Sequence, residues 1–128
     1  MTYHFSKTVA QTYDEAIETV TGRLKEKGFG VLTTIDVQKA MKEKIDKDIN
    51  PYIILGACNP TYAYQALQHE NKIGTMLPCN VVVQQHDDGS VEVSAVDPAA
   101  SMQAIDNADL GQLALKIRDM LKDVIDGL

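Results

Sequence analysis

The sequence predicts an α+β fold with a mainly antiparallel sheet of about five strands and helices packed on it. Three observations lead to this prediction. Segments with two-residue periodicity alternate with segments of helical periodicity along the chain. Asp88-Gly89 is a strong signal for a tight hairpin turn, which joins two strands in antiparallel order. The longest amphipathic stretch, residues 108–125, follows this hairpin as a C-terminal helix.

The length, composition and net charge of the chain are those of an ordinary globular protein. A chain of 128 residues is long enough for one hydrophobic core, so we expect a single domain over residues 1–128. The net charge of -6 argues against a nucleic-acid-binding surface, which would show clustered Lys and Arg. The Lys-rich stretch 39–47 also contains acidic residues, so it indicates a solvated helix face.

The termini and cysteines suggest a location. No apolar run approaches the roughly 20 residues of a membrane span. The N-terminal stretch lacks the basic and apolar regions of a signal peptide. Two cysteines without an export signal favour a reducing compartment, so we expect free thiols and a cytoplasmic protein with no membrane partner.

The first strand and helix have clear local signals. Residues 3–9 alternate between apolar and polar side chains, which predicts a half-buried strand. Thr12 and Glu15 have the spacing of a capping box, which satisfies two backbone amides at a helix start. Gly28 is suited to end this helix, because glycine adopts the left-handed conformation without a steric penalty.

A second strand and a short helix are expected next. Residues 29–37 predict a strand, and alternate residues share one face of it: Val31, Thr33, Ile35 and Val37. Residues 37–46 then have helical spacing but are charged and few, which indicates either a peripheral helix or a longer, partly disordered excursion. Asn50-Pro51 ends this segment, because the residue before proline avoids helical geometry.

The central stretch holds both cysteines. Residues 52–57 are almost continuously apolar, which is typical of a strand covered on both faces. Asn59-Pro60 suits the start of a helix over residues 61–70. A fourth strand is predicted from Gly74 or Thr75 to Val83, edge-like or bulged at Pro78 because proline cannot donate to a ladder.

The chain closes with a strand, a loop and a helix. The hairpin turn leads into a strand over residues 90–96, and residues 98–107 show no clear period and predict a loop. The C-terminal helix begins after Asp106 or Asn107, either of which can cap it.

Three motifs carry a resemblance to a known family. The runs GFGVLTTIDVQKAMKEK, YIILGACNPTYAYQAL and IGTMLPCNVVV resemble the bacterial family called domain of unknown function 302. The resemblance covers residues 3–97, with the C-terminal helix following. It implies a TATA-box-binding-protein-like fold class, a curved antiparallel sheet and frequent homodimers, but no assigned activity. It gives no warrant for DNA binding, since the chain is acidic.

Cys58 and Cys79 are the first candidates for chemistry. Each lies near the expected end of a strand and leans toward a buried face, where free cysteine is commonly a small hydrophobe. Alternatively, Cys58 precedes a helix whose dipole would lower the pKa of its thiol, with Cys79 as a resolving thiol if the two strands are adjacent.

Other catalytic and metal motifs are absent from the sequence. The three histidines have no ligand-like spacing with the cysteines, so we expect no metal site within one chain and no cofactor. The chain has no P-loop, nucleophile elbow or dinucleotide fingerprint.

Asn59 and Asn80 each follow one of the cysteines. Helix capping explains Asn59, whereas Asn80 is unusual inside a strand and is expected to satisfy a bulge or to line a pocket. The sequence thus predicts a homodimeric module that binds a small ligand or a partner, with a candidate site at Cys58, Asn59, Cys79 and Asn80. A thiol-dependent redox or transfer enzyme is the alternative.

Overall fold

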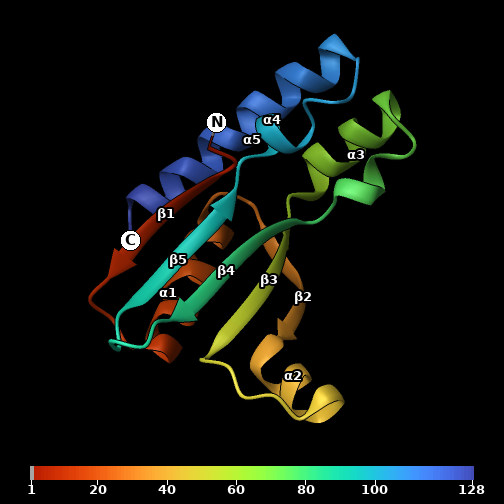
Figure 1. Ribbon diagram of the computed structural model, residues 1–128. Helices are drawn as coiled ribbons and strands as arrows, with labels where there is room; N and C mark the ends of the chain where they lie inside the picture. The colour runs from red at the N-terminus through yellow and green to blue at the C-terminus, as the bar shows by residue number, and fades with distance from the viewer. Residues whose placement is uncertain (1) are drawn as a thin grey trace.

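The computed structural model describes residues 2–128, and its centre is one antiparallel sheet (Figure 1). The strands lie in the order β1-β5-β4-β3-β2, and every neighbouring pair is antiparallel. The strands are β1 (His4–Val9), β2 (Gly30–Asp36), β3 (Tyr52–Cys58), β4 (Cys79–Gln85) and β5 (Val91–Val96). The predicted α+β class and five-stranded antiparallel sheet are confirmed.

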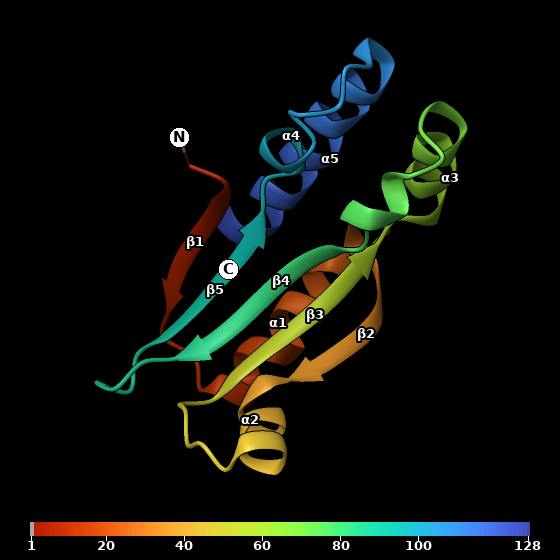
Figure 2. The ribbon, with the colours of Figure 1, turned by 45° about the vertical axis from the view of Figure 1, so that its right-hand side comes forward.

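Two long helices cover only one face of the sheet. Figure 2 shows α1 and α5 behind the strands, while the face toward the viewer carries no helix along its middle. We call the uncovered side the open face. The helical segments are α1 (Tyr13–Glu26), α2 (Val37–Ile45), α3 (Pro60–His69), the 3₁₀ turn η1 (Ile73–Met76), α4 (Pro98–Ser101) and α5 (Ala108–Asp126).

The hydrophobic core lies between the sheet and these two helices. Alternate strand residues point into it because successive side chains of a strand lie on opposite faces. The sheet contributes fully buried side chains from its three middle strands: Leu55 of β3, Val81 and Val83 of β4, and Val93 of β5. The helices contribute Val20 and Leu24 of α1 and Leu110, Leu121 and Ile125 of α5. Burying such side chains gives about 1.5–3 kcal/mol each, so this layer supplies most of the fold's stability.

The first helix begins and ends as predicted. The Glu15 amide donates to Thr12 Oγ1 at 3.2 Å, and the Thr12 amide donates to Glu15 Oε1 at 3.0 Å, so the capping box is confirmed. Gly28 has a φ of 84°, the left-handed conformation that glycine favours, and it leads the chain into β2.

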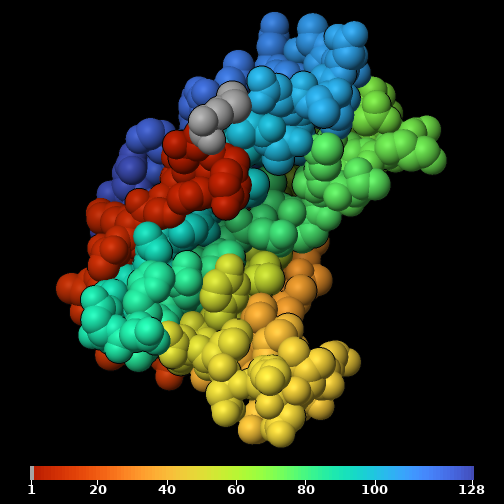
Figure 3. Space-filling view, in the orientation of Figure 1, coloured from red at the N-terminus to blue at the C-terminus, as the bar shows by residue number. Residues whose placement is uncertain are grey.

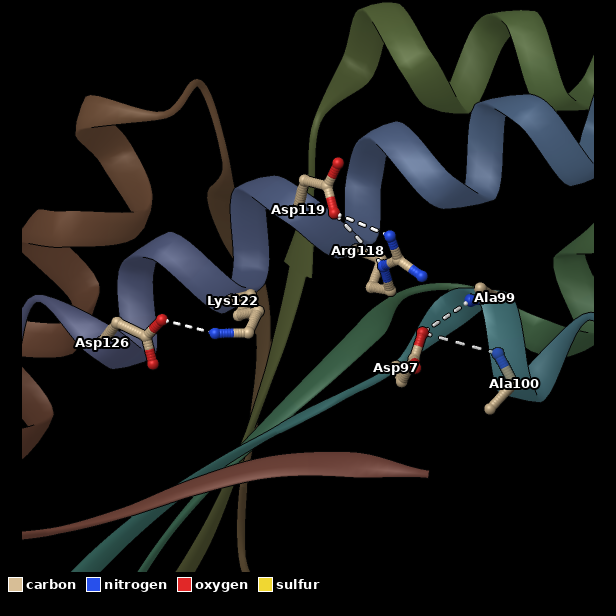
Figure 4. Close-up of polar contacts among 7 residues, drawn as sticks. All are labelled: Asp97, Ala99, Ala100, Arg118, Asp119, Lys122 and Asp126. Atoms are coloured by element: carbon tan, nitrogen blue, oxygen red, sulfur yellow. Dashed lines mark hydrogen bonds and ion pairs between the residues drawn. The ribbon is translucent and has the colours of Figure 1, made fainter. Parts of the chain in front are cut away.

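Two helix starts in the C-terminal part are also capped by side chains. Asp97 Oδ1 accepts hydrogen bonds from the amides of Ala99 at 2.9 Å and Ala100 at 3.4 Å, which starts α4 inside the stretch predicted as a loop (Figure 4). Of the two caps offered for α5, the structure uses Asn107, whose Oδ1 accepts from the Leu110 amide at 3.1 Å.

The ion pairs along α5 lie at the surface. Lys122 Nζ lies 2.7 Å from Asp126 Oδ2, and Arg118 Nη2 lies 2.9 Å from Asp119 Oδ1. Both pairs are drawn in Figure 4. Because the charged groups are largely exposed to water, which screens their attraction, each pair adds little to stability. The burial of the apolar stripe, rather than these pairs, therefore fixes α5 on the sheet.

The predicted start of the fourth strand was wrong. Residues 73–76 form the 3₁₀ turn, and β4 begins only at Cys79. Pro78 has no N–H and cannot donate to the ladder, so regular pairing starts after it. The first cross-strand pair joins Cys79 to Ala57.

Two predictions about strand faces were also wrong. A register shift between Val31 and Thr33 puts an extra residue into β2, so Val31 and Ile35 do not share a face as alternation predicts. The apolar strand 52–57 is covered on one face only, because the second long helix joins the first on the same side of the sheet. The side chains of Tyr52 and Ile54 are left half-buried on the open face.

Gly56 should tolerate no side chain. A Cβ at this position would lie 2.7 Å from Pro78 Cγ and still closer to Thr33 Oγ1. We expect Gly56→Ala to lower the free energy of unfolding by about 1–3 kcal/mol, the usual cost of overpacking. Urea denaturation measures this change in the free energy of unfolding. Gly111→Ala is the matched control, because a Cβ on this stretch of α5 would meet no atom within 4 Å. Its free energy of unfolding should rise by up to about 1 kcal/mol, since alanine favours a helix more than glycine does. Equal changes in the two variants would contradict the packing argument.

Candidate functional site

The structure brings three of the four predicted site residues together. Strands β3 and β4 are neighbours, and Cys79 is paired with Ala57, the residue before Cys58. Cys58, Asn59 and Cys79 line one pocket between the strand ends, α3 and α5. The other side chains around it are almost all apolar: Phe29, Ala57, Tyr62, Ala63, Ala66, Leu77, Met102, Leu110, Leu113, Ala114 and Ile117.

This cysteine pocket is nearly filled by its own side chains. Its cavity measures about 20 Å³, which is room for one water molecule, whereas small-molecule sites measure about 300–1,000 Å³. A ligand could enter only if α3 moved away from α5. The site predicted at the cysteines therefore stays a prediction, and the closed geometry does not favour it.

Both thiols are held in the protonated form. Burial raises the pKa of Cys58 above its usual value. Burial, and then the neighbouring Cys58, raise the pKa of Cys79 to about 11. The helix start after Cys58 was expected to lower a thiol pKa, but desolvation dominates because the charged thiolate loses its hydration. Protonated thiols are poor nucleophiles, so the thiol-dependent alternative gains no support.

Asn59 is occupied by structural bonds. Its Oδ1 accepts from the Tyr62 amide at 3.3 Å, which caps α3, and its Nδ2 donates to the Lys27 carbonyl at 3.4 Å. The capping interpretation of Asn59 is confirmed. The second bond ties the start of α3 to the end of α1.

Asn80 lies apart from the other three. Its side chain is exposed on the open face, between Gly56 of β3 and the Val96 position of β5. There it lines a different and larger depression of about 360 Å³, which we call the open-face groove. Its lining residues are Tyr3, His4, Ser6, Tyr52, Asn80, Val82, Gln84, Glu92, Ser94, Ala95 and Val96.

Polar side chains in the open-face groove form a short hydrogen-bonded chain. His4 Nδ1 lies 2.8 Å from Ser6 Oγ, which lies 2.7 Å from Ser94 Oγ across the β1–β5 pair. The sequence analysis missed this group. Alternation did place polar residues on one face of the first strand, but the strand order that puts Ser6 beside Ser94 has no local signal.

A third feature is apolar surface on the β2 side of the molecule. Leu32 and Ile35 on β2 are 68% and 50% exposed, and Ile45 at the end of α2 is 59% exposed. Helix α3 adds Tyr64 and Leu67, at 66% and 46%. Figure 3 shows the surface hollowed between α2 and α3 on this side. We call these elements (α2, β2 and α3) the β2 flank.

Metal ligands are not gathered anywhere in the described part of the chain. Among residues 2–128, no group of three or more His, Cys, Asp and Glu side chains could hold a metal ion. The helices described there are also too short or too polar to span a bilayer.

Comparison with known proteins then gives the family. The sequence profile of the family described as domain of unknown function DUF302 matches residues 5–128. The chain belongs to this family. A crystal structure of an uncharacterized conserved DUF302 protein from Bacillus stearothermophilus superposes with a TM-score of 0.92 at 29% identity, covering 98% of each chain. The comparison with curated proteins found no match.

Family membership confirms the resemblance seen in the sequence motifs. It adds no activity, because DUF302 is defined by sequence and not by a reaction. The TATA-box-binding-protein-like class implied by the resemblance stays a prediction.

The state of the thiols can be measured directly. We expect both to remain protonated at neutral pH, with Cys79 half ionised near pH 11 because burial raises its pKa. Thiolate ultraviolet absorbance against pH reports this ionisation, and subtracting the curve of Cys79→Ser isolates the buried thiol from the tyrosines. A pKa below the usual thiol value of 9.0 for either cysteine would contradict the burial argument and would support the thiol-dependent enzyme instead.

Proposed function

We propose that this DUF302 protein is a self-associating interaction module whose two copies join through the β2 flank. Helix α2 carries the proposal, because none of its residues is buried. A nine-residue helix is marginal in water on propensity alone and normally depends on packing. The helix lies against β2 and β3. Its side chains Val37, Ala40 and Met41 are only half-buried, and Ile45 is exposed. A second surface over α2 would give this helix the packing it lacks.

The edge of the sheet supports the same surface. β2 is an outer strand, so one side of its backbone has no partner strand. Uncharged, β-branched edges invite pairing, and proteins usually protect them with lysine or proline. The stretch from Val31 to Ile35 has neither. By contrast, the other edge, β1, carries Lys7, whose Nζ donates to the Asp126 carbonyl at 3.0 Å.

A second copy of this chain is the partner that the flank fits best. Two-fold symmetric contact of β2 with β2 is antiparallel, so the end of one strand meets the start of the other. Because α2 follows the end of β2 and α3 begins beside its start, this contact sets α2 of each copy against α3 of the other. Ile45 would then cover Tyr64 and Leu67, which are exposed in one copy.

Charge supports self-association as well. Residues 37–47 contain four lysines, one glutamate and one aspartate, a net charge of +2 in a chain of -6, which leaves -8 for the rest. The basic helix of one copy is therefore attracted by the acidic body of another.

The proposal predicts a dimer that a single charge disrupts. Size-exclusion chromatography with light scattering should give twice the chain mass of 14.1 kDa. Leu32→Asp should shift the protein to 14.1 kDa, because an apolar contact of the flank is replaced by a desolvated carboxylate. Circular dichroism should be unchanged, since Leu32 is exposed in the single copy.

Leu115→Asp is the matched control. Leu115 is 43% exposed on α5, outside the flank, so this variant should remain dimeric. A wild-type protein that is monomeric even at high concentration would contradict the proposal. So would a Leu32→Asp variant that remains dimeric while Leu115→Asp becomes monomeric.

A further inference from the structure

The open-face groove has the dimensions of a small-molecule site. Its volume of about 360 Å³ falls within the range of about 300–1,000 Å³ typical of ligand pockets, in contrast to the nearly filled cysteine pocket. Strands β1, β3, β4 and β5 form its floor, so the site is built on the sheet rather than on loops. The lining residues named above lie outside α2, β2 and α3, which carry the proposed dimer contact.

The groove presents many groups that can form hydrogen bonds. The side chains of Tyr52, Asn80 and Gln84 have no hydrogen-bond partner within residues 2–128, which leaves their donors and acceptors for a ligand. The Ser6 and Ser94 hydroxyls add another donor and acceptor pair at the opposite side. Apolar side chains lie between the polar ones, with Val82 and Val96 half-buried in the floor.

The charge of the groove restricts the ligand. None of its lining residues is Lys or Arg, and Glu92 is its one carboxylate, held by His86 at 3.0 Å. A bound anion would face this carboxylate with no Lys or Arg among the described lining residues to compensate it. The whole chain is acidic as well, so its field also disfavours anions.

Aromatic rings complete the lining. Tyr3 and Tyr52 contribute a ring each, and a tyrosine ring offers an apolar face beside a hydroxyl. A ring for apolar contact, amides and a carboxylate for hydroxyl groups, and the lack of Lys and Arg among the lining residues together suit a compact molecule that is polar at its rim and uncharged.

We propose that the open-face groove binds a neutral polyhydroxyl compound of monosaccharide size. The hydroxyl groups of the ligand would bond to Asn80, Gln84 and Glu92, and its C–H surface would lie on Val82 and Tyr52. The site is independent of the cysteines and of the proposed dimer.

Saturation-transfer NMR on the full chain tests the ligand class with two probes of one size. Glucose is neutral and gluconate is anionic. Glucose should receive saturation from the protein, and gluconate should not. Titration of glucose should saturate at millimolar concentrations, as expected for a small ligand with few contacts.

Two variants locate the binding. Asn80→Ala combined with Gln84→Ala should weaken glucose binding about tenfold, because it removes two hydrogen-bonding groups. These side chains make no hydrogen bonds to other residues of the described range 2–128, so folding should be unaffected. Glu92→Gln should allow gluconate to bind while glucose binding changes little. Gln103→Ala combined with Gln112→Ala removes two exposed amides elsewhere and serves as the control.

Three results would overturn the proposal: no saturation transfer to any probe, equal transfer to gluconate and glucose, or equal affinity in the groove variant and the control. None of them bears on the dimer, whose test is the mass in solution.

Discussion

The structure depends on one constraint, which is that its two long amphipathic helices cover the same face of the sheet. Leu24 of α1 and Leu121 of α5 are both fully buried against the strands. This layer contains the hydrophobic core, and among residues 2–128 no long helix covers the other face. The open face and the β2 edge therefore meet solvent or a partner, and the two uncovered surfaces follow from how the core is built.

The sequence predicted the elements whose signals are local. The capping box of Thr12 and Glu15 and the Asp88-Gly89 turn each act within a few residues, so the pattern alone is sufficient. It did not predict the extra residue between Val31 and Thr33, which depends on how β2 meets β3. Nor could it give the strand order that separates Asn80 from the cysteine pocket, since that order is a property of the whole sheet.

The cysteines show how a local pattern can mislead about chemistry. A thiol before a helix start is typical of reactive sites, and the strands of Cys58 and Cys79 do lie side by side. The same packing that brings them together also removes water, and desolvation raises the pKa of both thiols. Proximity and reactivity are therefore opposed here, because the pocket that holds the pair has room for about one water molecule and none for a substrate.

The two uncovered surfaces differ in a way that decides what each can bind. The β2 flank exposes leucine and isoleucine beside unpaired backbone, which favours a large protein surface that can exclude water from both. The open-face groove has half-buried valines surrounded by amides and hydroxyls, and a protein surface laid over it would leave some of these polar groups without partners. A small ligand with hydroxyl groups on its rim can satisfy them one by one. Dimer contact at one edge and ligand contact on the open face are thus compatible in the same molecule, because each surface suits a different kind of occupant.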